Sequence, residues 1–174
     1  MKMLKKLLAV VLTGAMALTL FTACGSNAVG NAVTDKDLAD AMTDVAKAQG
    51  LDVIVTPRAE EWEMARKIAA LAESGTDNVD NEKKILGCDQ GGVNENNFVW
   101  VQNALTDKLG AEGQAFQVME SLTDKGGAYN FSSLGSKEPA DTRYMGTALC
   151  KIPDQKDNLV TVRVIVVTAK AEDE

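Results

Sequence analysis

The sequence predicts an α+β domain in which three main helices pack on a small, mostly antiparallel sheet. Apolar residues recur at helical spacing within residues 34–74 and 112–124, whereas residues 144–152 and 159–169 have the character of β-strands. The last of these segments is apolar on both faces in its second half, as expected of a central strand covered on both sides. The pattern predicts one globular domain over residues 34–170.

The first helix is expected to begin after Thr34, because Thr34 and Asp37 form a start that is similar to a capping box. It is expected to end at Gly50, since glycine suits the left-handed position that follows a helix. Residues 53–55 should be extended. A second helix should follow, with Thr56 as its cap and Pro57 at its first position, and it should end near residues 74–75.

Residues 75–84 are polar, and we expect them to form a solvated loop. The acidic run of Asp77, Asp80 and Glu82 raises the possibility of calcium binding, but the central glycine and closing bidentate glutamate of a calcium loop are missing. Residues 85–88 and 98–101 are predicted to be strands, with a turn or bulge in the glycine-containing segment between them.

The third helix is expected over residues 112–124, and residues 127–143 are expected to be irregular. The chain should close with a hairpin of two strands, 144–152 and 159–169, joined by the polar turn 153–158. The acidic end, residues 172–174, is expected to be frayed.

The amino-terminal segment has the order of a secretory signal. Lys2, Lys5 and Lys6 precede an apolar run, which small residues close just before Cys24. A cysteine directly after threonine and alanine resembles the bacterial lipobox, with Phe21 where leucine or valine is usual. The resemblance implies cleavage after residue 23, lipidation of Cys24, and a flexible tether over residues 24–33.

A transmembrane helix is the alternative interpretation of this segment. Such a helix needs about 20 predominantly apolar residues. The run here is shorter and is interrupted by Thr13, Gly14 and Thr19. The lipoprotein interpretation is therefore favoured, with the domain outside the cytoplasm and attached to the membrane through Cys24.

The charge of the mature part limits its partners. After residue 23 the chain carries 15 basic against 25 acidic residues, a net charge of −10. Such a surface repels phosphate backbones, so nucleic-acid binding is disfavoured. It also disfavours electrostatic attachment to anionic lipid, which makes a covalent anchor more necessary.

The chain contains no histidine. This excludes Ser-His-Asp and Cys-His catalysis and any metal site built on imidazole, and we expect no cofactor. Cys88 and Cys150 remain after the lipidated cysteine. In a compartment that permits oxidation they could form a disulfide, or they could be two separate buried thiols, and the sequence leaves both alternatives open.

Several local segments resemble the CAP superfamily, which comprises cysteine-rich secretory, insect antigen-five and plant pathogenesis-related proteins. Asn94-Glu95-Asn96 is similar to the family's Gly-Glu-Asn strand motif. The order of elements over residues 34–169 is also similar. Further similar segments are 48–51, 61–65, 118–121 and 142–148.

The resemblance implies an α-β-α sandwich, a three-layer fold that would explain a last strand with two apolar faces. Metal-binding members use two histidines with two acidic residues, and of these ligands only Glu95 has a counterpart here. The resemblance therefore implies a divergent, metal-free CAP-like domain. CAP-like domains often act outside the cell by binding sterols, lipids, glycans or other proteins.

Three functions are compatible with this sequence. The first is a tethered, non-catalytic module that binds a glycan, lipid or protein at the cell envelope, with a site around Glu95, Asn96, Trp100 and Tyr129. Trp100 has the alternative role of a core residue. The second is a hydrolase of cell-wall material or peptides that uses carboxylates alone, and the third is an accessory subunit of an envelope complex. The carboxylates considered for hydrolysis are Asp89, Glu95 and Glu61.

Overall fold

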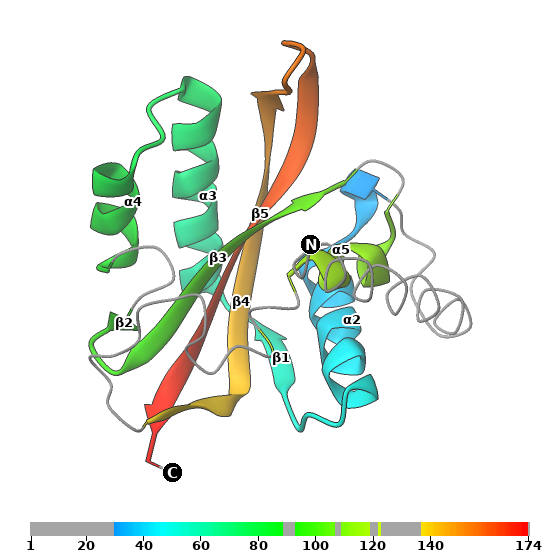
Figure 1. Ribbon diagram of the computed structural model, residues 1–174, viewed down its shortest axis with the longest axis vertical. Helices are drawn as coiled ribbons and strands as arrows, with labels where there is room; N and C mark the ends of the chain where they lie inside the picture. The colour runs from blue at the N-terminus through cyan, green and yellow to red at the C-terminus, as the bar shows by residue number, and fades with distance from the viewer. Residues whose placement is uncertain (1–29, 89–92, 107–108, 119–121, 123–136, 174) are drawn as a thin grey trace, which may run out of the picture.

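The computed structural model describes residues 30–88, 93–106, 109–118, 122 and 137–173 (Figure 1). In this part of the chain, four α-helices and a short 3-10 turn (Gly30–Ala32) accompany a five-stranded mixed sheet. The prediction of an α+β fold is confirmed. The signal and the tether up to residue 29 lie outside the described residues.

The strands lie in the order β1-β4-β5-β3-β2. Antiparallel pairs join β4 to β5, β5 to β3 and β3 to β2, whereas β1 at the edge runs parallel to β4. The predicted closing hairpin is therefore the middle of the sheet. The strands are β1 (Ile54–Pro57), β2 (Val93–Asn94), β3 (Asn97–Leu105), β4 (Glu138–Pro153) and β5 (Leu159–Glu172).

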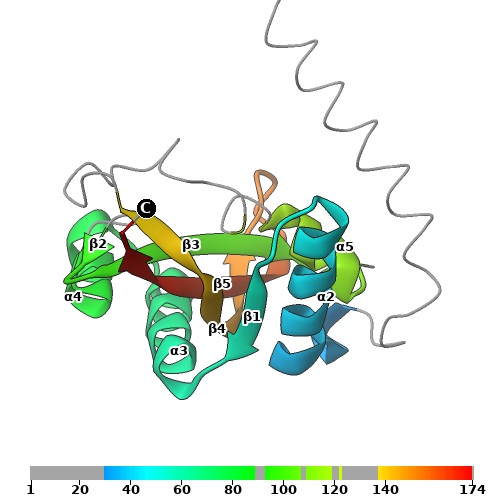
Figure 2. The same cartoon turned by 90° about the horizontal axis from the view of Figure 1, so that it is seen from below.

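Helices pack against both faces of this sheet. Two of them, α2 (Asp35–Ala48) and α5 (Ala111–Gln117), share an apolar cluster with one face. The other two, α3 (Ala59–Ser74) and α4 (Val79–Leu86), share a second cluster with the opposite face. Figure 2 shows α2 and α5 beside each other and well separated from α3 and α4.

Alternating side chains of β5 supply both clusters. Val164 and Val166 belong to the cluster under α3 and α4, and Ile165 and Val167 to the cluster under α2 and α5. All four are at most 2% exposed. The prediction that this strand is central and covered on both sides is confirmed.

The first helix forms as its sequence predicts. The Thr34 hydroxyl accepts a hydrogen bond from the Asp37 amide, and the Asp37 carboxylate accepts one from the Thr34 amide, which completes a capping box. Gly50 follows the helix with φ +76°, in the left-handed region that glycine adopts without strain. The predicted end of this helix is therefore also correct.

The predicted start of the second helix is wrong. Thr56 and Pro57 belong to β1, which pairs with Tyr144 and Met145 of β4, and α3 begins only after Arg58. Proline is tolerated in β1 because β1 is an edge strand and needs fewer backbone donors. Pairing with a distant part of the chain overrides the local helix signal.

The predicted loop 75–84 and strand 85–88 are also wrong, because residues 79–86 form α4. Asn78 caps this helix by accepting the Asn81 amide at 3.0 Å, and Gly87 ends it with φ +74°. These are ordinary helix start and stop signals. They were obscured because Glu82, a charged residue, occupies a buried position of the helix.

Several element bounds differ from the prediction. The third helix ends at Gln117, and residues 119–121 and 123–124 lie outside the described part. Of the segment expected to be irregular, residues 138–143 belong to β4, which also has a bulge between Pro139 and Arg143. The acidic end is ordered up to Glu172, where β5 still pairs with Glu138. Cross-strand pairing explains both extensions.

Gly146 sets the distance between α3 and the sheet. A Cβ atom at this position would overlap the backbone of Glu61 and Trp62 in α3. Backbone atoms cannot move aside as a flexible side chain can. A residue without a side chain is therefore required where α3 crosses β4.

Replacing Gly146 with alanine should lower the free energy of unfolding by about 3 kcal/mol or more, because a helix must shift to admit the methyl group. Gly113→Ala is the matched control, since its Cβ would meet the side chain of Leu109 at 3.1 Å. Alanine also favours the helix by up to about 1 kcal/mol, so the control should change little. Urea unfolding measures both variants, and equal losses would contradict the interpretation.

Candidate functional site

The structure does not assemble the binding surface predicted around Trp100. The Trp100 side chain is fully buried in the cluster under α2 and α5, where its ring stacks 5.8 Å from that of Phe98. The guanidinium of Arg143 lies 5.3 Å from the centre of the indole ring. Trp100 is therefore a core residue, which was its alternative role.

Glu95 and Asn96 are exposed in the turn that joins β2 to β3. Glu95 adopts a positive φ of 53°, and the carbonyl oxygen of Asn96 accepts the Ala171 amide at 2.7 Å. The neighbouring Asn94 amide donates to the Leu86 carbonyl at 2.8 Å, which ties the turn to the end of α4. The other two predicted residues, Asp89 and Tyr129, lie outside the described part of the chain.

Glu61, which was considered as a catalytic carboxylate, is hydrogen-bonded inside the fold. It is fully buried on the α3 side of the sheet, and its carboxylate accepts two hydrogen bonds from Arg58 and one from the Thr168 hydroxyl at 2.6 Å. The hydrogen bond and charge of Glu61 raise the pKa of Arg58 although burial opposes them. Arg58 also lies 4.1 Å from the ring centre of Tyr144. Glu61 is therefore bonded within the fold, and it lies on the opposite face of the sheet from Trp100.

A second buried charge is equally well satisfied. Arg163 of β5 donates to the Gln114 amide oxygen at 2.8 Å, to the Thr147 hydroxyl at 2.8 Å and to the Val33 carbonyl at 2.7 Å. Thr147 in turn hydrogen-bonds the carboxylate of Asp35. Burial lowers the pKa of Arg163, and the charge of Asp35 opposes this. Both networks connect helices to the sheet, so they hold the fold together.

The side chains with unusual chemistry lie elsewhere, around a cavity of about 240 Å³ between α3, the start of α4 and the sheet. Most of its wall is apolar. Four of its lining residues can exchange protons or hydrogen bonds with a ligand: Asp77, Glu82, Asn103 and Cys150. Asp77 is exposed at the rim, whereas Glu82 is only 9% exposed.

Glu82 and Asp77 are two carboxyl groups that line the cavity and interact with each other. Burial, and after it the interaction with Asp77, together raise the pKa of Glu82 to about 7. At neutral pH, Glu82 is therefore divided between its protonated and ionised forms. A protonated carboxyl group can donate a hydrogen bond or a proton inside the cavity.

The thiol of Cys150 does not provide a nucleophile in this cavity. Burial raises its pKa, and the negative charges of Glu73 and Asp77 raise it further. Reactive cysteines need the opposite shift, because the thiolate is the nucleophile. The described structure contains no disulfide between Cys150 and Cys88, and both are buried in the cluster under α3 and α4.

Sequence reasoning missed this pair. Asp77 and Glu82 were noticed as acidic residues of an expected solvated loop, where no carboxylate would be buried. The capping pattern of Asn78 and Gly87 was the signal that could have placed residues 79–86 in a helix. Within the described residues, no group of three or more cysteine or acidic side chains could hold a metal ion.

The pair makes stability depend on pH. Between about pH 4.5 and 7 the folded protein keeps a proton on Glu82 that the unfolded chain has released, so the free energy of unfolding should fall as pH rises through this window. We expect a contribution of about 1–2 kcal/mol, because water at the rim screens the charge.

Urea unfolding at pH 4.5, 6 and 7.5 measures this dependence. Glu82→Gln removes the titrating group and should flatten it, whereas Asp80→Asn, an exposed position on the same helix, should leave it unchanged. Identical pH profiles for Glu82→Gln and the unmodified protein would show that Glu82 does not titrate abnormally.

A scan against models of protein families finds no match, and searches of curated proteins and of solved structures find none either. No helix in the described residues has the length and apolar character needed to cross a bilayer. The function is therefore inferred from the residues and their geometry.

Proposed function

We propose that this protein is a lipid-anchored extracytoplasmic module that binds a ligand at the bacterial cell envelope without catalysis. The signal segment and Cys24 supply the anchor, and the cavity beside α4 supplies the binding site. The observation that carries the proposal is the buried Glu82, whose raised pKa places a hydrogen-bond donor inside a mostly apolar cavity. We propose neither a nucleic-acid partner nor a bound cofactor.

A divergent CAP-like fold is part of this proposal. The order helix, strand, two helices, two strands, helix and closing hairpin supports it, as do helices on both faces of the sheet. The position of Glu95 in an exposed turn gives no support for a central metal cleft. The module is therefore proposed as a metal-free variant.

The lining of the cavity indicates the chemistry of its ligand. Asp77 at the rim repels anions, and the apolar wall excludes strongly hydrated groups. Protonated Glu82 and the Asn103 amide can donate to a carbonyl, ether or hydroxyl oxygen. The cavity is smaller than most sites for whole ligands, so it accepts one uncharged portion of a glycan, lipid or peptide.

The same carboxyl pair supports a second candidate function, hydrolysis of a peptide-like bond. The ionised carboxylate would take a proton from water, the hydroxyl would add to the carbonyl carbon, and the protonated carboxyl group would donate its proton to the carbonyl oxygen. The C–N bond would then break, with the proton held by the first carboxyl group passing to the departing amine and the carbonyl proton returning to the second.

A screen of the mature protein against glycans, lipids, peptides and cell-wall fragments tests both functions. For a binding module, Glu82→Leu should weaken binding about tenfold by removing the buried donor, while Asp80→Asn binds normally. For a hydrolase, substrate should be turned over, and Asp77→Asn and Glu82→Gln should each abolish turnover. Binding that is indifferent to Glu82→Leu would show that the cavity is not the site.

The anchor is tested separately by Cys24→Ser. This variant should lose lipid labelling and move from the membrane fraction to the medium, or stay uncleaved with its signal attached. Labelling with radioactive palmitate and fractionation measure the outcome. Unchanged labelling of the variant would refute lipidation at Cys24.

A further inference from the structure

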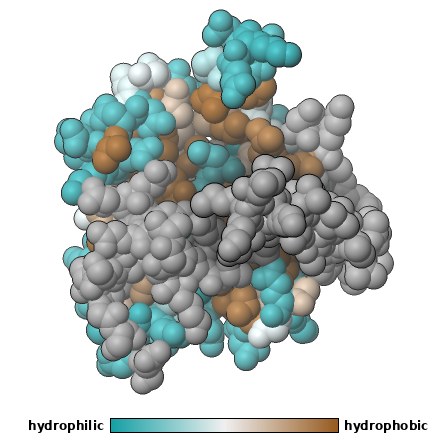
Figure 3. Space-filling view, viewed as in Figure 1, coloured by the Kyte–Doolittle hydropathy of each residue, from teal (hydrophilic) through white to brown (hydrophobic). Residues whose placement is uncertain are grey.

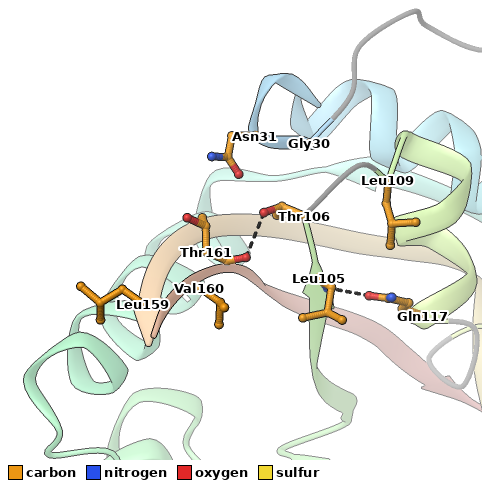
Figure 4. A pocket seen from close by; sticks show the side chains of 9 residues that line it. All are labelled: Gly30, Asn31, Leu105, Thr106, Leu109, Gln117, Leu159, Val160 and Thr161. Atoms are coloured by element: carbon orange, nitrogen blue, oxygen red, sulfur yellow. Dashed lines mark hydrogen bonds between the residues drawn. The ribbon is translucent and has the colours of Figure 1, made fainter. Parts of the chain in front are cut away.

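A second concave surface lies where β3 ends and β5 begins, beside the start of the described chain. This groove has a volume of about 780 Å³, and Figure 4 shows its lining. None of its nine described lining residues is charged, although a quarter of the whole chain is charged. They are Gly30, Asn31, Leu105, Thr106, Leu109, Gln117, Leu159, Val160 and Thr161.

Two polar side chains of the groove are hydrogen-bonded within the protein. The Thr106 hydroxyl donates to the Thr161 carbonyl at 2.9 Å, and the Gln117 amide oxygen accepts the Leu105 amide at 2.6 Å (Figure 4). The side chains of Leu105 and Leu159 are exposed to solvent. Leu159 is 71% exposed and Leu105 is 55% exposed. Figure 3 shows apolar surface beneath the polar tip of the β4–β5 hairpin.

The chain enters the domain at the edge of this groove. The Gly30 amide donates to the Leu109 carbonyl at 2.8 Å, and the Gly30 carbonyl accepts the Gln114 side chain at 3.1 Å. Gly30 also has φ +64°, and a Cβ atom there would meet the Thr106 carbonyl oxygen at 3.1 Å. The point from which the tether leaves is therefore fixed beside the exposed leucines.

The length of the tether then limits how the domain can face the membrane. Five residues lie between Cys24 and Gly30, and the six residue steps from one to the other span about 20 Å when fully extended. A lipidated Cys24 therefore holds Gly30, and the groove beside it, close to the bilayer. An anchored domain needs little additional attraction to dock, because docking is intramolecular.

We propose that the groove is a membrane-docking surface whose leucines enter the headgroup region of the bilayer that carries the anchor. The inference rests on the proposed lipid anchor at Cys24 and adds the orientation of the domain. The nearby turn carries Asp154 and Asp157 against Lys156, so anionic lipid gives no attraction there. Apolar insertion therefore supplies the contact, at the end of the sheet where β4 and β5 join.

The test uses the acylated mature protein in vesicles of phosphatidylcholine with brominated acyl chains. A polarity-sensitive fluorophore is attached at Leu159→Cys or Leu105→Cys, with Val79→Cys on α4 as the control, since Val79 is 66% exposed. Cys88 and Cys150 are buried, so labelling favours the introduced thiol. Side chains in the interface enter about 5–10 Å, within reach of the brominated chains.

The proposal expects blue-shifted and strongly quenched emission at positions 105 and 159 and neither effect at position 79. Adding Leu159→Asp to the Leu105→Cys protein should lower the ratio of docked to undocked molecules by about tenfold. Emission that is neither shifted nor quenched at positions 105 and 159 overturns docking. A blue shift without quenching also overturns it, because it would mean that a second copy or a soluble ligand occupies the groove. Mass spectrometry of each sample verifies acylation, so failure of the anchor is distinguished from failure of docking.

Discussion

The two-sided burial of β5 is the constraint on which the rest of the molecule depends. From Val164 to Val167, β5 has apolar side chains on both of its faces. Both faces must be shielded from water, so helices are needed on each side of the sheet. The same strand pairs with β4 on one side and β3 on the other, which makes it the central strand of the sheet. The cluster with α2 and α5 and the cluster with α3 and α4 both follow from this one segment.

The parts of the fold that were predictable are those with a complete local signal. Such signals need only residues that are neighbours in the sequence. Examples are the capping box of Thr34 and Asp37, the glycine after the first helix, and the polar turn of the closing hairpin. Pro57 gave a local helix signal too, but its segment pairs with a strand some ninety residues away along the chain. No local pattern contains that information.

The candidate site was less predictable than the fold, because burial of a polar residue is a tertiary property. Trp100 and Glu61 were considered for recognition because aromatic and acidic side chains often serve it, yet both are core residues. Glu82 was assigned to solvent because its neighbours are polar. Its environment is created by α3 and by residues of β3, β4 and β5, which are distant in the sequence.

Three buried ionisable groups, Glu61, Arg163 and Glu82, differ in the partner that each one has. Glu61 faces Arg58, and Arg163 faces neutral acceptors with Asp35 behind Thr147, so these charges are compensated and their networks stabilise packing. Glu82 faces another acid. A second acid cannot offset the cost of burying an ionised carboxylate. Such pairs are more typical of functional sites than of residues that only stabilise the fold.

The hydrogen bonds of Gly30, Val33 and Arg163 also have a mechanical consequence. Gly30 is bonded to Leu109 and Gln114, and the Val33 carbonyl is bonded to Arg163 in the middle of the sheet. A pulling force on the preceding chain is therefore borne first by residues that bridge α5 and β5, and only later by the helix that follows. The hydrogen bonds at the entry of the chain thus transmit such a force to α5 and to the central strand β5.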